Sequence, residues 1–368
     1  MKFFCAQADL EEALNVVNKA ITPNTTMPVL NNIFLKAEGK KLLFAATNLE
    51  IAIQHSIPAD IRSEGAITVP AKLISSYISL LKDEKIEATL GDGNTVTLSS
   101  TSSQTKIKGI NADEFPVIPK VPKENTIKVP AKELNSAIMQ TVFAASTNTS
   151  RPVLSGVLFD LDRDALKIVA TDSYRLAERK ILLKDKTAIS LQSIIPSRTI
   201  IELGKILSKA QDEFVEINLT KNQVLFTIGG IELMSRLIEG KFPDYDKIIP
   251  KTTKTKITVS TEDLSLVVKR VSLFARENNN SIKVAATNDG KLILSTEETK
   301  IGEEKAEVAV KVEGENNKIA LNAQYLLDVL TFIQADKVVV EIDDKLAPAV
   351  IRPVDNKDYV YIIMPLKI

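Results

Sequence analysis

Arg151-Pro-Val-Leu-Ser-Gly-Val-Leu-Phe-Asp-Leu161 and Lys167-Ile-Val-Ala-Thr-Asp-Ser-Tyr-Arg-Leu176 form the stretch that decides the fold. Its two apolar runs are separated by the acidic turn Asp162-Arg-Asp-Ala165. Short apolar runs bounded by turn-forming residues are typical of β-strands. The stretch therefore predicts a pair of strands joined by a tight turn.

The same stretch occurs at two other places in the chain. Met27-Pro-Val-Leu-Asn-Asn-Ile-Phe-Leu with Leu43-Phe-Ala-Ala-Thr-Asn48 is an earlier copy, and its Pro28 lies 124 residues before Pro152. Ser281-Ile-Lys-Val-Ala-Ala with Leu292-Ile-Leu-Ser-Thr-Glu297 is a weaker, later copy, in which Thr296 lies 125 residues after Thr171. Three copies at a nearly constant spacing indicate a tandem triplication.

A second repeated phrase marks the start of a helix. It reads Val69-Pro-Ala-Lys72, Ile195-Pro-Ser-Arg198 and Leu321-Asn-Ala-Gln324. Pro70, Pro196 and Asn322 follow one another at a spacing of 126 positions. Proline suits the first helical position because its φ is already set. Asparagine at the equivalent place can cap the helix instead.

Amphipathic helices are also predicted near the start of each repeat, at 9–20, 131–145 and 261–275. Ser260 and Asp263 have the spacing of a capping box. Alternating strands close each repeat, so the helices would cover one side of antiparallel sheets in an α+β layer architecture. We expect three domains, at 1–120, 121–250 and 251–368.

Composition bounds the class of protein. A chain of 368 residues is long enough for about three domains. Its 47 Lys and Arg residues balance its 47 Asp and Glu residues, so the net charge predicts no general attraction to nucleic acid. Cys5 is the only cysteine, which excludes an intrachain disulfide and fits a reducing compartment. No stretch approaches the roughly 20 apolar residues of a membrane span. We expect a cytoplasmic protein without membrane partners.

Motifs along the whole chain resemble those of the bacterial DNA polymerase sliding clamp, the β subunit of the replicative DNA polymerase III holoenzyme. They are Met27-Pro-Val-Leu-Asn-Asn, Val69-Pro-Ala-Lys72, Phe115-Pro116, Val169-Ala-Thr-Asp-Ser-Tyr-Arg-Leu-Ala177, Gly240-Lys-Phe-Pro-Asp-Tyr245, Asn322-Ala-Gln-Tyr-Leu-Leu-Asp-Val-Leu330 and Ile363-Met-Pro-Leu366. The resemblance implies three DNA-clamp domains in a head-to-tail dimeric ring, with sheets outside and twelve helices around duplex DNA.

The resemblance also implies a non-catalytic processivity factor that needs no cofactor. It would hold double-stranded DNA topologically, without regard to sequence. Its partners would be a second copy of the chain, the replicative polymerase catalytic subunit, the clamp loader and other replication and repair proteins with a clamp-binding motif.

The first implied site is a peptide pocket between the second and third repeats, where partners insert a short, mostly apolar motif. Apolar side chains with a few polar groups suit such a pocket. The alternative is that Leu154, Leu176 and Ile362 are ordinary core. The matching positions are Leu154, Thr171, Ser173, Tyr174, Arg175, Leu176, Pro243, Lys247, Asn322, Tyr325, Ile362, Met364, Pro365 and Leu366.

Contact with DNA is the second implied site, and its alternative is solvated surface charge. Lys72 and Arg198 occupy equivalent positions of the repeated phrase. Asn24 stands where a basic loop residue is common in the family, which argues against contact from that loop. The candidates are Lys72, Arg151, Arg198, Lys205, Lys209 and Lys251.

The third implied site closes the ring. Leu273 and Phe274 match the family's apolar contact, and Ile107 would face them from the partner. A head-to-tail contact requires two different surfaces, and the two ends of this chain are unlike. The alternative is that Phe274 only covers the end of its own helix.

No catalytic residue and no metal site is predicted. His55, the only histidine, lies in an alternating stretch typical of strand surface. Asp160, Asp162 and Asp164 begin like a calcium loop, but Ala165 replaces the expected glycine, so they fit a hairpin turn. A metal-dependent nuclease is a competing hypothesis that rests only on abundant carboxylates. A specialised clamp paralogue also stays open.

Overall fold

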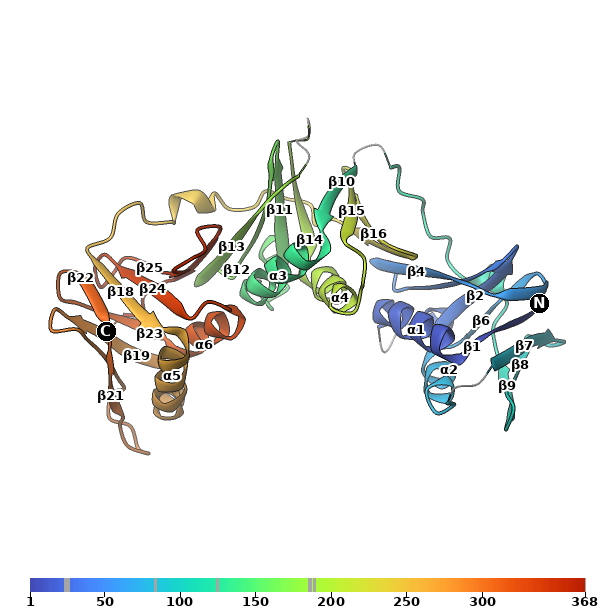
Figure 1. Cartoon of the computed structure of the whole chain (residues 1–368), viewed down its shortest axis with the longest axis horizontal. Helices are drawn as coiled ribbons and strands as arrows, with labels where there is room; N and C mark the ends of the chain where they lie inside the picture. The colour runs from blue at the N-terminus through green and yellow to red at the C-terminus, as the bar shows by residue number, and fades with distance from the viewer. Residues whose placement is uncertain (23–26, 83–84, 124–125, 185–186, 188–189, 368) are drawn as a thin grey trace. The chain divides into compact units, whose positions relative to one another are not determined.

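A computed structural model describes residues 1–22, 27–82, 85–123, 126–184, 187 and 190–367 (Figure 1). The chain divides into two compact units. Unit 1 comprises Met1–Ala131 and Lys205–Leu237, and unit 2 comprises Lys132–Gly204 and Ile238–Ile368. Each unit contains two antiparallel sheets.

Unit 1 contains helices α1 (Gln7–Val17) and α2 (Ala71–Ile78) and the end of α4 (Ser197–Leu207). Its strands are β1 (Lys2–Ala6), β2 (Asn32–Glu38), β3 (Lys41–Thr47), β4 (Ile51–Pro58), β5 (Asp60–Ser63), β6 (Gly65–Pro70), β7 (Lys85–Gly91), β8 (Thr95–Ser99), β9 (Gln104–Lys108), β10 (Thr126–Pro130), β15 (Phe214–Leu219), β16 (Gln223–Ile228) and β17 (Ile231–Arg236).

Strand pairing joins the first repeat to the second. The sheets of unit 1 have the orders β5-β1-β7-β8-β9 and β10-β15-β16-β17-β4-β3-β2-β6. In the longer sheet, β17 pairs with β4, so that Ile231 lies opposite His55 and Ser235 opposite Ile51. Because this ladder crosses the repeat boundary, strands of the second repeat belong to unit 1.

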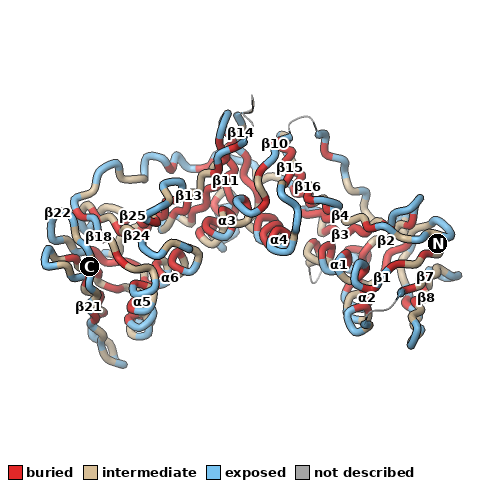
Figure 2. Tube along the Cα trace, viewed as in Figure 1, coloured by how far each residue is buried: buried red, intermediate tan, exposed pale blue. Residues whose placement is uncertain are grey.

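Helices α1 and α2 lie against the sheets of unit 1 through their apolar sides (Figures 1 and 2). Leu10, Leu14 and Val17 of α1 are almost completely buried, as their helical spacing predicts. Burial of each such side chain contributes about 1.5–3 kcal/mol. Gln7 Nε2 donates a hydrogen bond of 2.8 Å to the carbonyl of Ile78, which satisfies an acceptor at the end of α2.

Unit 2 contains α3 (Ala131–Thr141), the start of α4, α5 (Thr261–Ala275) and α6 (Ala323–Phe332). Its strands are β11 (Gly156–Asp162), β12 (Ala165–Thr171), β13 (Arg175–Leu182), β14 (Leu191–Pro196), β18 (Thr255–Ser260), β19 (Ser281–Thr287), β20 (Lys291–Ser295), β21 (Lys305–Ala309), β22 (Lys311–Gly314), β23 (Asn317–Asn322), β24 (Lys337–Ile342), β25 (Ala349–Pro353) and β26 (Tyr359–Ile363).

The second and third repeats are joined in the same way. The sheets of unit 2 have the orders β14-β11-β12-β13-β26-β25-β24-β18-β22 and β21-β20-β19-β23. Strand β13 of the second repeat pairs with β26, the last strand of the third, from Arg175 opposite Ile363 to Arg179 opposite Tyr359. A continuous sheet therefore positions residues of both repeats side by side.

The element predictions need correction mainly at their ends. The quoted hairpin is present as β11 and β12, but Pro152–Ser155 forms a 3-10 turn rather than strand. The predicted capping bond is present, since Ser260 Oγ accepts from the N–H of Asp263 at 3.3 Å. Pro70 and Pro196 lie directly before their helices rather than in the first helical position, because each is still the last residue of a strand.

In the part of the chain described here, no helix has the length and apolar character needed to cross a membrane.

Candidate functional site

The turn between β12 and β13, here called the 171–176 turn, contains five of the predicted peptide-binding residues. Thr171 Oγ1 donates to the carbonyl of Arg175 at 2.6 Å. Asp172 Oδ1 accepts the N–H groups of Tyr174 at 2.9 Å and Arg175 at 3.0 Å. Ser173 has φ +81°, a left-handed conformation that is uncommon outside glycine. These bonds fix the turn and leave Tyr174 62% exposed at its tip.

Arg175 links this turn to the helical layer instead of facing solvent. Its Nε donates to Asp172 Oδ2 at 3.0 Å, its Nη1 to Asp328 of α6, and its Nη2 to the carbonyl of Phe143 at 2.8 Å. The guanidinium carbon lies 4.5 Å from the centroid of the Tyr325 ring, a cation–π contact. Its side chain is only 12% exposed. Arg175 therefore positions the turn against α6.

The electrostatics of Arg175 support this positioning role. Burial by itself would lower its pKa, but Tyr361, Asp328 and Asp172 together raise the pKa above its ordinary value. The guanidinium stays charged, and the two carboxylates neutralise it within a partly buried site.

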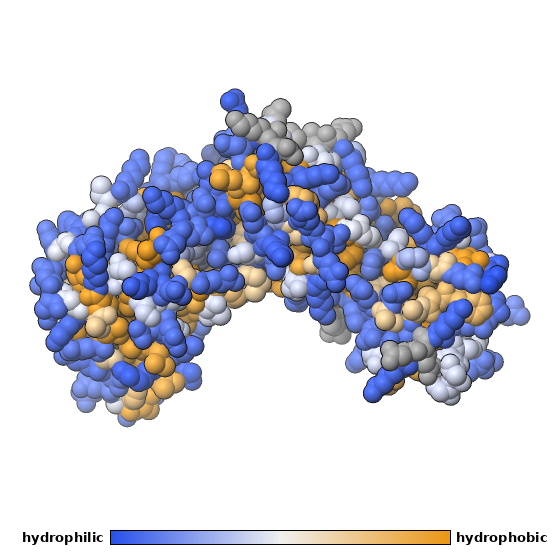
Figure 3. Space-filling view, in the orientation of Figure 1, coloured by the Kyte–Doolittle hydropathy of each residue, from blue (hydrophilic) through white to orange (hydrophobic). Residues whose placement is uncertain are grey.

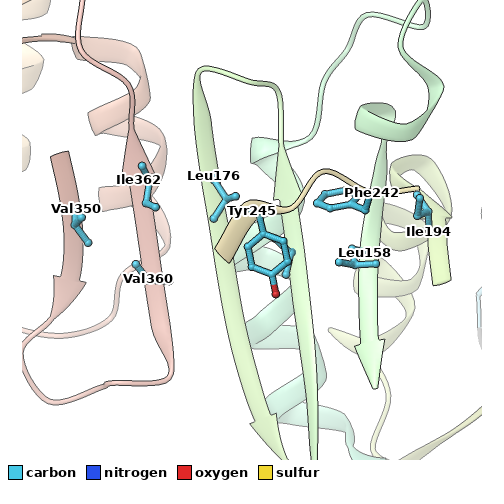
Figure 4. Close-up of a cluster of buried hydrophobic side chains, with 9 residues drawn as sticks. Leu158, Leu176, Ile194, Phe242, Tyr245, Val350, Val360 and Ile362 are labelled. Atoms are coloured by element: carbon cyan, nitrogen blue, oxygen red, sulfur yellow. The ribbon is translucent and has the colours of Figure 1, made fainter. Parts of the chain in front are cut away.

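Leu176 points to the opposite face of the sheet from Arg175, because successive side chains of a strand alternate. There it joins a buried apolar cluster, in which it is 2% exposed and Ile362 is 1% exposed (Figure 4). The cluster consists of Leu158, Val169, Leu176, Ile194, Phe242, Tyr245, Val350, Val360 and Ile362, with Val153, Ile238 and Ile249 packed against it. In this structure Leu176 and Ile362 are thus buried in the apolar cluster of the repeat junction. Leu154, 8% exposed, is also buried.

The segment between β17 and β18 covers this cluster. Phe242 and Tyr245 pack edge to face with ring centroids 6.2 Å apart, and both are buried. Burial raises the pKa of Tyr245, and the nearby Glu178 carboxylate raises it further. Pro243 and Lys247 are exposed between and beyond these anchors, and Lys247 Nζ pairs with Asp244 Oδ2 at 2.6 Å.

Ile248 follows Lys247 and is 41% exposed. The prediction omitted it, although its position beside Lys247 was a usable signal. Phe242, Tyr245 and Asp328 were omitted as well, and the sequence gives no sign that Asp328 would meet Arg175.

The last residues of the chain lie beside the turn. The N–H of Met364 donates to the carbonyl of Tyr174 at 2.8 Å, and that of Leu366 to the carbonyl of Ala320 at 2.9 Å. Met364, Pro365 and Leu366 are half-buried. Residues 364–366 are therefore docked by backbone hydrogen bonds to Tyr174 and Ala320.

Asn322 caps α6, as predicted. Its Oδ1 accepts the N–H groups of Gln324 at 2.8 Å and Tyr325 at 3.3 Å. The Tyr325 ring lies over Arg175, so this helix start is tied to the turn after β12.

The predicted DNA contacts occupy several different places. Lys72 is exposed on α2, and Arg198 is half-buried in the first turn of α4. Arg151 Nη1 donates to Ser173 Oγ at 3.3 Å, which places Arg151 beside the peptide residues. Lys251 is exposed and lies outside any helix. Asn24 lies outside the described residues.

Lys205 of α4, Lys209 just beyond α4 and Lys19 just beyond α1 lie around a hollow in unit 1. Glu11, Glu12 and Asp212 line the same hollow, so its charge is mixed.

The residues predicted to close the ring differ in exposure. Leu273 is 53% exposed and Phe274 half-buried at the end of α5, where apolar surface gathers (Figure 3). Ile107, in contrast, is only 3% exposed, because it alternates inward on β9 with exposed Lys106 and Lys108. Its side chain is core of the first repeat, so the expectation that it faces a partner needs correction. Strands β9 and β21 are the outer strands of their sheets.

The described residues include no group of three or more His, Cys, Asp or Glu side chains arranged to hold a metal ion.

Comparisons with known proteins agree along the whole chain. Residues 1–119, 128–244 and 246–367 match the N-terminal, central and C-terminal domain models of the DNA polymerase III beta subunit. The beta sliding clamp of Staphylococcus epidermidis is 33% identical over 363 residues, 96% of each chain. That of Staphylococcus aureus is 32% identical over the same share.

Solved structures agree as well. The DNA polymerase sliding clamp of Bacillus subtilis has a TM-score of 0.95 at 31% identity. The alignment covers 100% of this chain and 99% of the Bacillus subtilis chain. A sliding clamp of Pseudomonas aeruginosa bound to griselimycin has a TM-score of 0.95 at 28% identity, with 100% of both chains covered.

Three tandem α+β repeats joined edge to edge by their sheets define the class of DNA clamps. The chain belongs to the family of bacterial DNA polymerase III β subunits. Its function is that of a sliding clamp, a non-catalytic processivity factor, and the family assignment sets the nuclease hypothesis aside.

Proposed function

We propose that the chain works in the cytoplasm as a head-to-tail homodimeric ring around duplex DNA, with domains at 1–120, 121–250 and 251–368. The ring tethers the replicative polymerase, the clamp loader and other motif-bearing proteins. The observation that carries the tethering site is one apolar cluster to which Leu176, Phe242 and Tyr245 contribute, with Met364 hydrogen-bonded to the turn beside it.

The proposed peptide surface combines a rigid base with exposed contacts. Leu176 and Ile362 form part of the base, whereas Tyr174 and Ile248, in the two segments that contribute to it, are exposed. A partner would bury these exposed apolar groups together with half-buried Met364, which repacks readily against different side chains. Arg175 holds the turn in place and need not touch the peptide.

The proposed DNA contacts are basic side chains on or beside the helices: Lys72 on α2 and Lys205 on α4 are exposed, and so is Lys209, which lies just beyond the end of α4. Lysines contact phosphates irrespective of sequence. Arg151 and Lys251 lie away from these helices and are proposed as further contacts.

The proposed ring contact pairs unlike ends of two chains. Strand β9 offers Lys106 and Lys108, whereas the region of β21 offers Glu303, Lys305 and Glu307, of which Glu307 pairs with Lys291 at 3.4 Å. Two different patches, one basic and one of mixed charge, meet the requirement of a heterologous contact. Pairing β9 with a partner's β21 would also remove two open sheet edges.

The double variant Leu273→Ala with Phe274→Ala tests the ring contact. We expect it to shift the dimer towards monomer in sedimentation velocity and to abolish stable loading onto DNA, because apolar burial at the contact is lost. Leu266→Ala, 62% exposed on the same helix, is the matched control and should behave as wild type. Normal dimerisation and loading of the double variant would contradict this interface.

A further inference from the structure

The turn after β3 reproduces the hydrogen bonds of the 171–176 turn. Thr47 Oγ1 donates to the carbonyl of Ile51 at 2.8 Å, and Asn48 Oδ1 accepts the N–H groups of Glu50 at 3.0 Å and Ile51 at 2.8 Å. Leu49 has φ +74°, as Ser173 has +81°. A leucine in this conformation indicates that the surrounding bonds determine the turn.

The neighbouring strand is placed equivalently. The N–H of Arg236, at the end of β17, donates to the carbonyl of Glu50 at 3.1 Å, as that of Met364 donates to Tyr174. Glu50 and Arg236 therefore occupy the positions of Tyr174 and Met364. The two repeat junctions therefore have the same backbone hydrogen-bond pattern. They differ in the side chains at these two positions.

A groove of about 250 Å³ lies at this turn in unit 1. Its apolar lining includes Leu49, Ala52, Val117, Ile118 and Met234. Leu49 is 48% exposed and Val117 is 93% exposed, so two large apolar groups stand at the surface of the groove.

Beneath the groove lies a small buried cluster. Ala52 and Met234 pack there with Val121 and Leu225, and Ile118 packs against them. The 116–121 segment thus covers the junction of the first two repeats as the 242–248 segment covers the next junction.

We propose that this groove is a second peptide-binding site, for an extended segment with one large apolar side chain and an adjacent acidic residue. The class of occupant rests on the function proposed for the 171–176 surface, whose backbone the groove repeats. The acidic flank follows from exposed Arg236, which stands where the other site has uncharged Met364. Glu50, at the neighbouring position, would repel an acidic residue of the bound segment. The acidic residue should therefore lie next to Arg236, which fixes the direction in which the segment binds.

The test is a titration of the full-length protein with end-blocked, fluorescein-labelled Asp-Leu-Leu-Phe and with Lys-Leu-Leu-Phe. We expect two sites per chain for the acidic peptide. Arg236→Glu should weaken one site about fivefold and reverse the preference there towards the lysine peptide. Tyr174→Ala should weaken only the other site. Lys120→Glu, an exposed charge reversal on the covering segment, is the control and should change neither.

The outcomes separate the two proposals. A single site, weakened by Tyr174→Ala and unaffected by Arg236→Glu, would overturn the second groove and leave the proposed function standing. A single site weakened by Arg236→Glu and by Val117→Asp, but not by Tyr174→Ala, would support the groove and contradict the 171–176 surface. Two sites whose affinities are both unchanged by Arg236→Glu would overturn the proposal of a second peptide-binding groove.

Discussion

Arg175 shows how single residues set the geometry of the junction between the second and third repeats. Its guanidinium forms ion pairs with Asp172 and Asp328 and lies over the ring of Tyr325. One side chain therefore connects the turn between two strands to helix α6. The neighbouring residue Leu176 serves the other face of the sheet. Two adjacent residues of the predicted site therefore have different tasks, one positioning the turn and one building the apolar base.

Replacement of Arg175 by methionine should destabilise the protein by about 2–4 kcal/mol, because two partly buried carboxylates lose their partner. Denaturant unfolding followed by circular dichroism measures this change. Arg175→Met with Asp328→Leu should recover part of the loss, and exposed Lys247→Met should leave the stability unchanged. Equal stabilities of Arg175→Met and wild type would contradict the positioning role.

His55 gives a prediction about pH. Its Nδ1 is buried and has no hydrogen-bond partner among the described residues. Burial lowers its pKa below the ordinary value of 6.5, and Glu12 only partly opposes this. As the pH falls below 6.5, the unfolded chain binds the proton first, so stability present above that pH is progressively lost.

His55→Gln should therefore flatten the decline in the free energy of unfolding between pH about 7.5 and about 5.5. Urea titrations at several pH values compare the two proteins. Parallel pH profiles for wild type and variant would show that the pKa of His55 is the same in the folded and the unfolded protein, which would contradict this prediction.

At the residue scale, the surroundings of two candidate site residues could not be predicted. Ile107 was expected on the surface because the family resemblance assigned it to the ring contact, yet the alternation of β9 turns it inward. Arg175 carried no signal that its charge would be neutralised by Asp328, since those residues lie far apart in the sequence and meet only through tertiary packing.

At the scale of elements, the repeat made the sequence informative. Three copies allowed helices and hairpins to be placed, and α5 ends where the pattern predicted. The pairing of β17 with β4 and of β26 with β13 was not predictable, because strand propensity gives no partner across such a separation. Those two ladders build both repeat junctions, so the family resemblance could suggest candidate site residues, but the arrangement of those residues could not be predicted.

Removal of residues 364–368 should eliminate the peptide surface while leaving the dimer intact. The deletion takes away the bonds from Met364 to Tyr174 and from Leu366 to Ala320, together with a half-buried apolar rim. We expect at least about a tenfold loss of affinity for a polymerase-derived peptide, measured by fluorescence anisotropy. Lys367→Ala, an exposed change within the same segment, is the control. Unchanged affinity of the deletion variant would refute the surface.

At the scale of the whole molecule, balanced charge is compatible with a tether that depends on closure instead of tight binding. A non-specific DNA contact with a Kd of about 10⁻⁵ M and an association rate near about 10⁸ M⁻¹s⁻¹ would dissociate at roughly 10³ s⁻¹. A polymerase held in that way would be lost within about a millisecond. A closed ring stays on DNA without strong contacts, so 47 basic and 47 acidic residues present no obstacle.

Retention on DNA tests the ring most directly. The protein is loaded by a clamp loader onto nicked circular DNA, and the bound fraction is followed before and after a single cut linearises the circle. Topological linkage predicts stable retention on the circle and rapid loss through the ends of the linear form. Equal loss from both forms, or equal retention on both, would contradict encirclement and mean that contacts alone hold the protein.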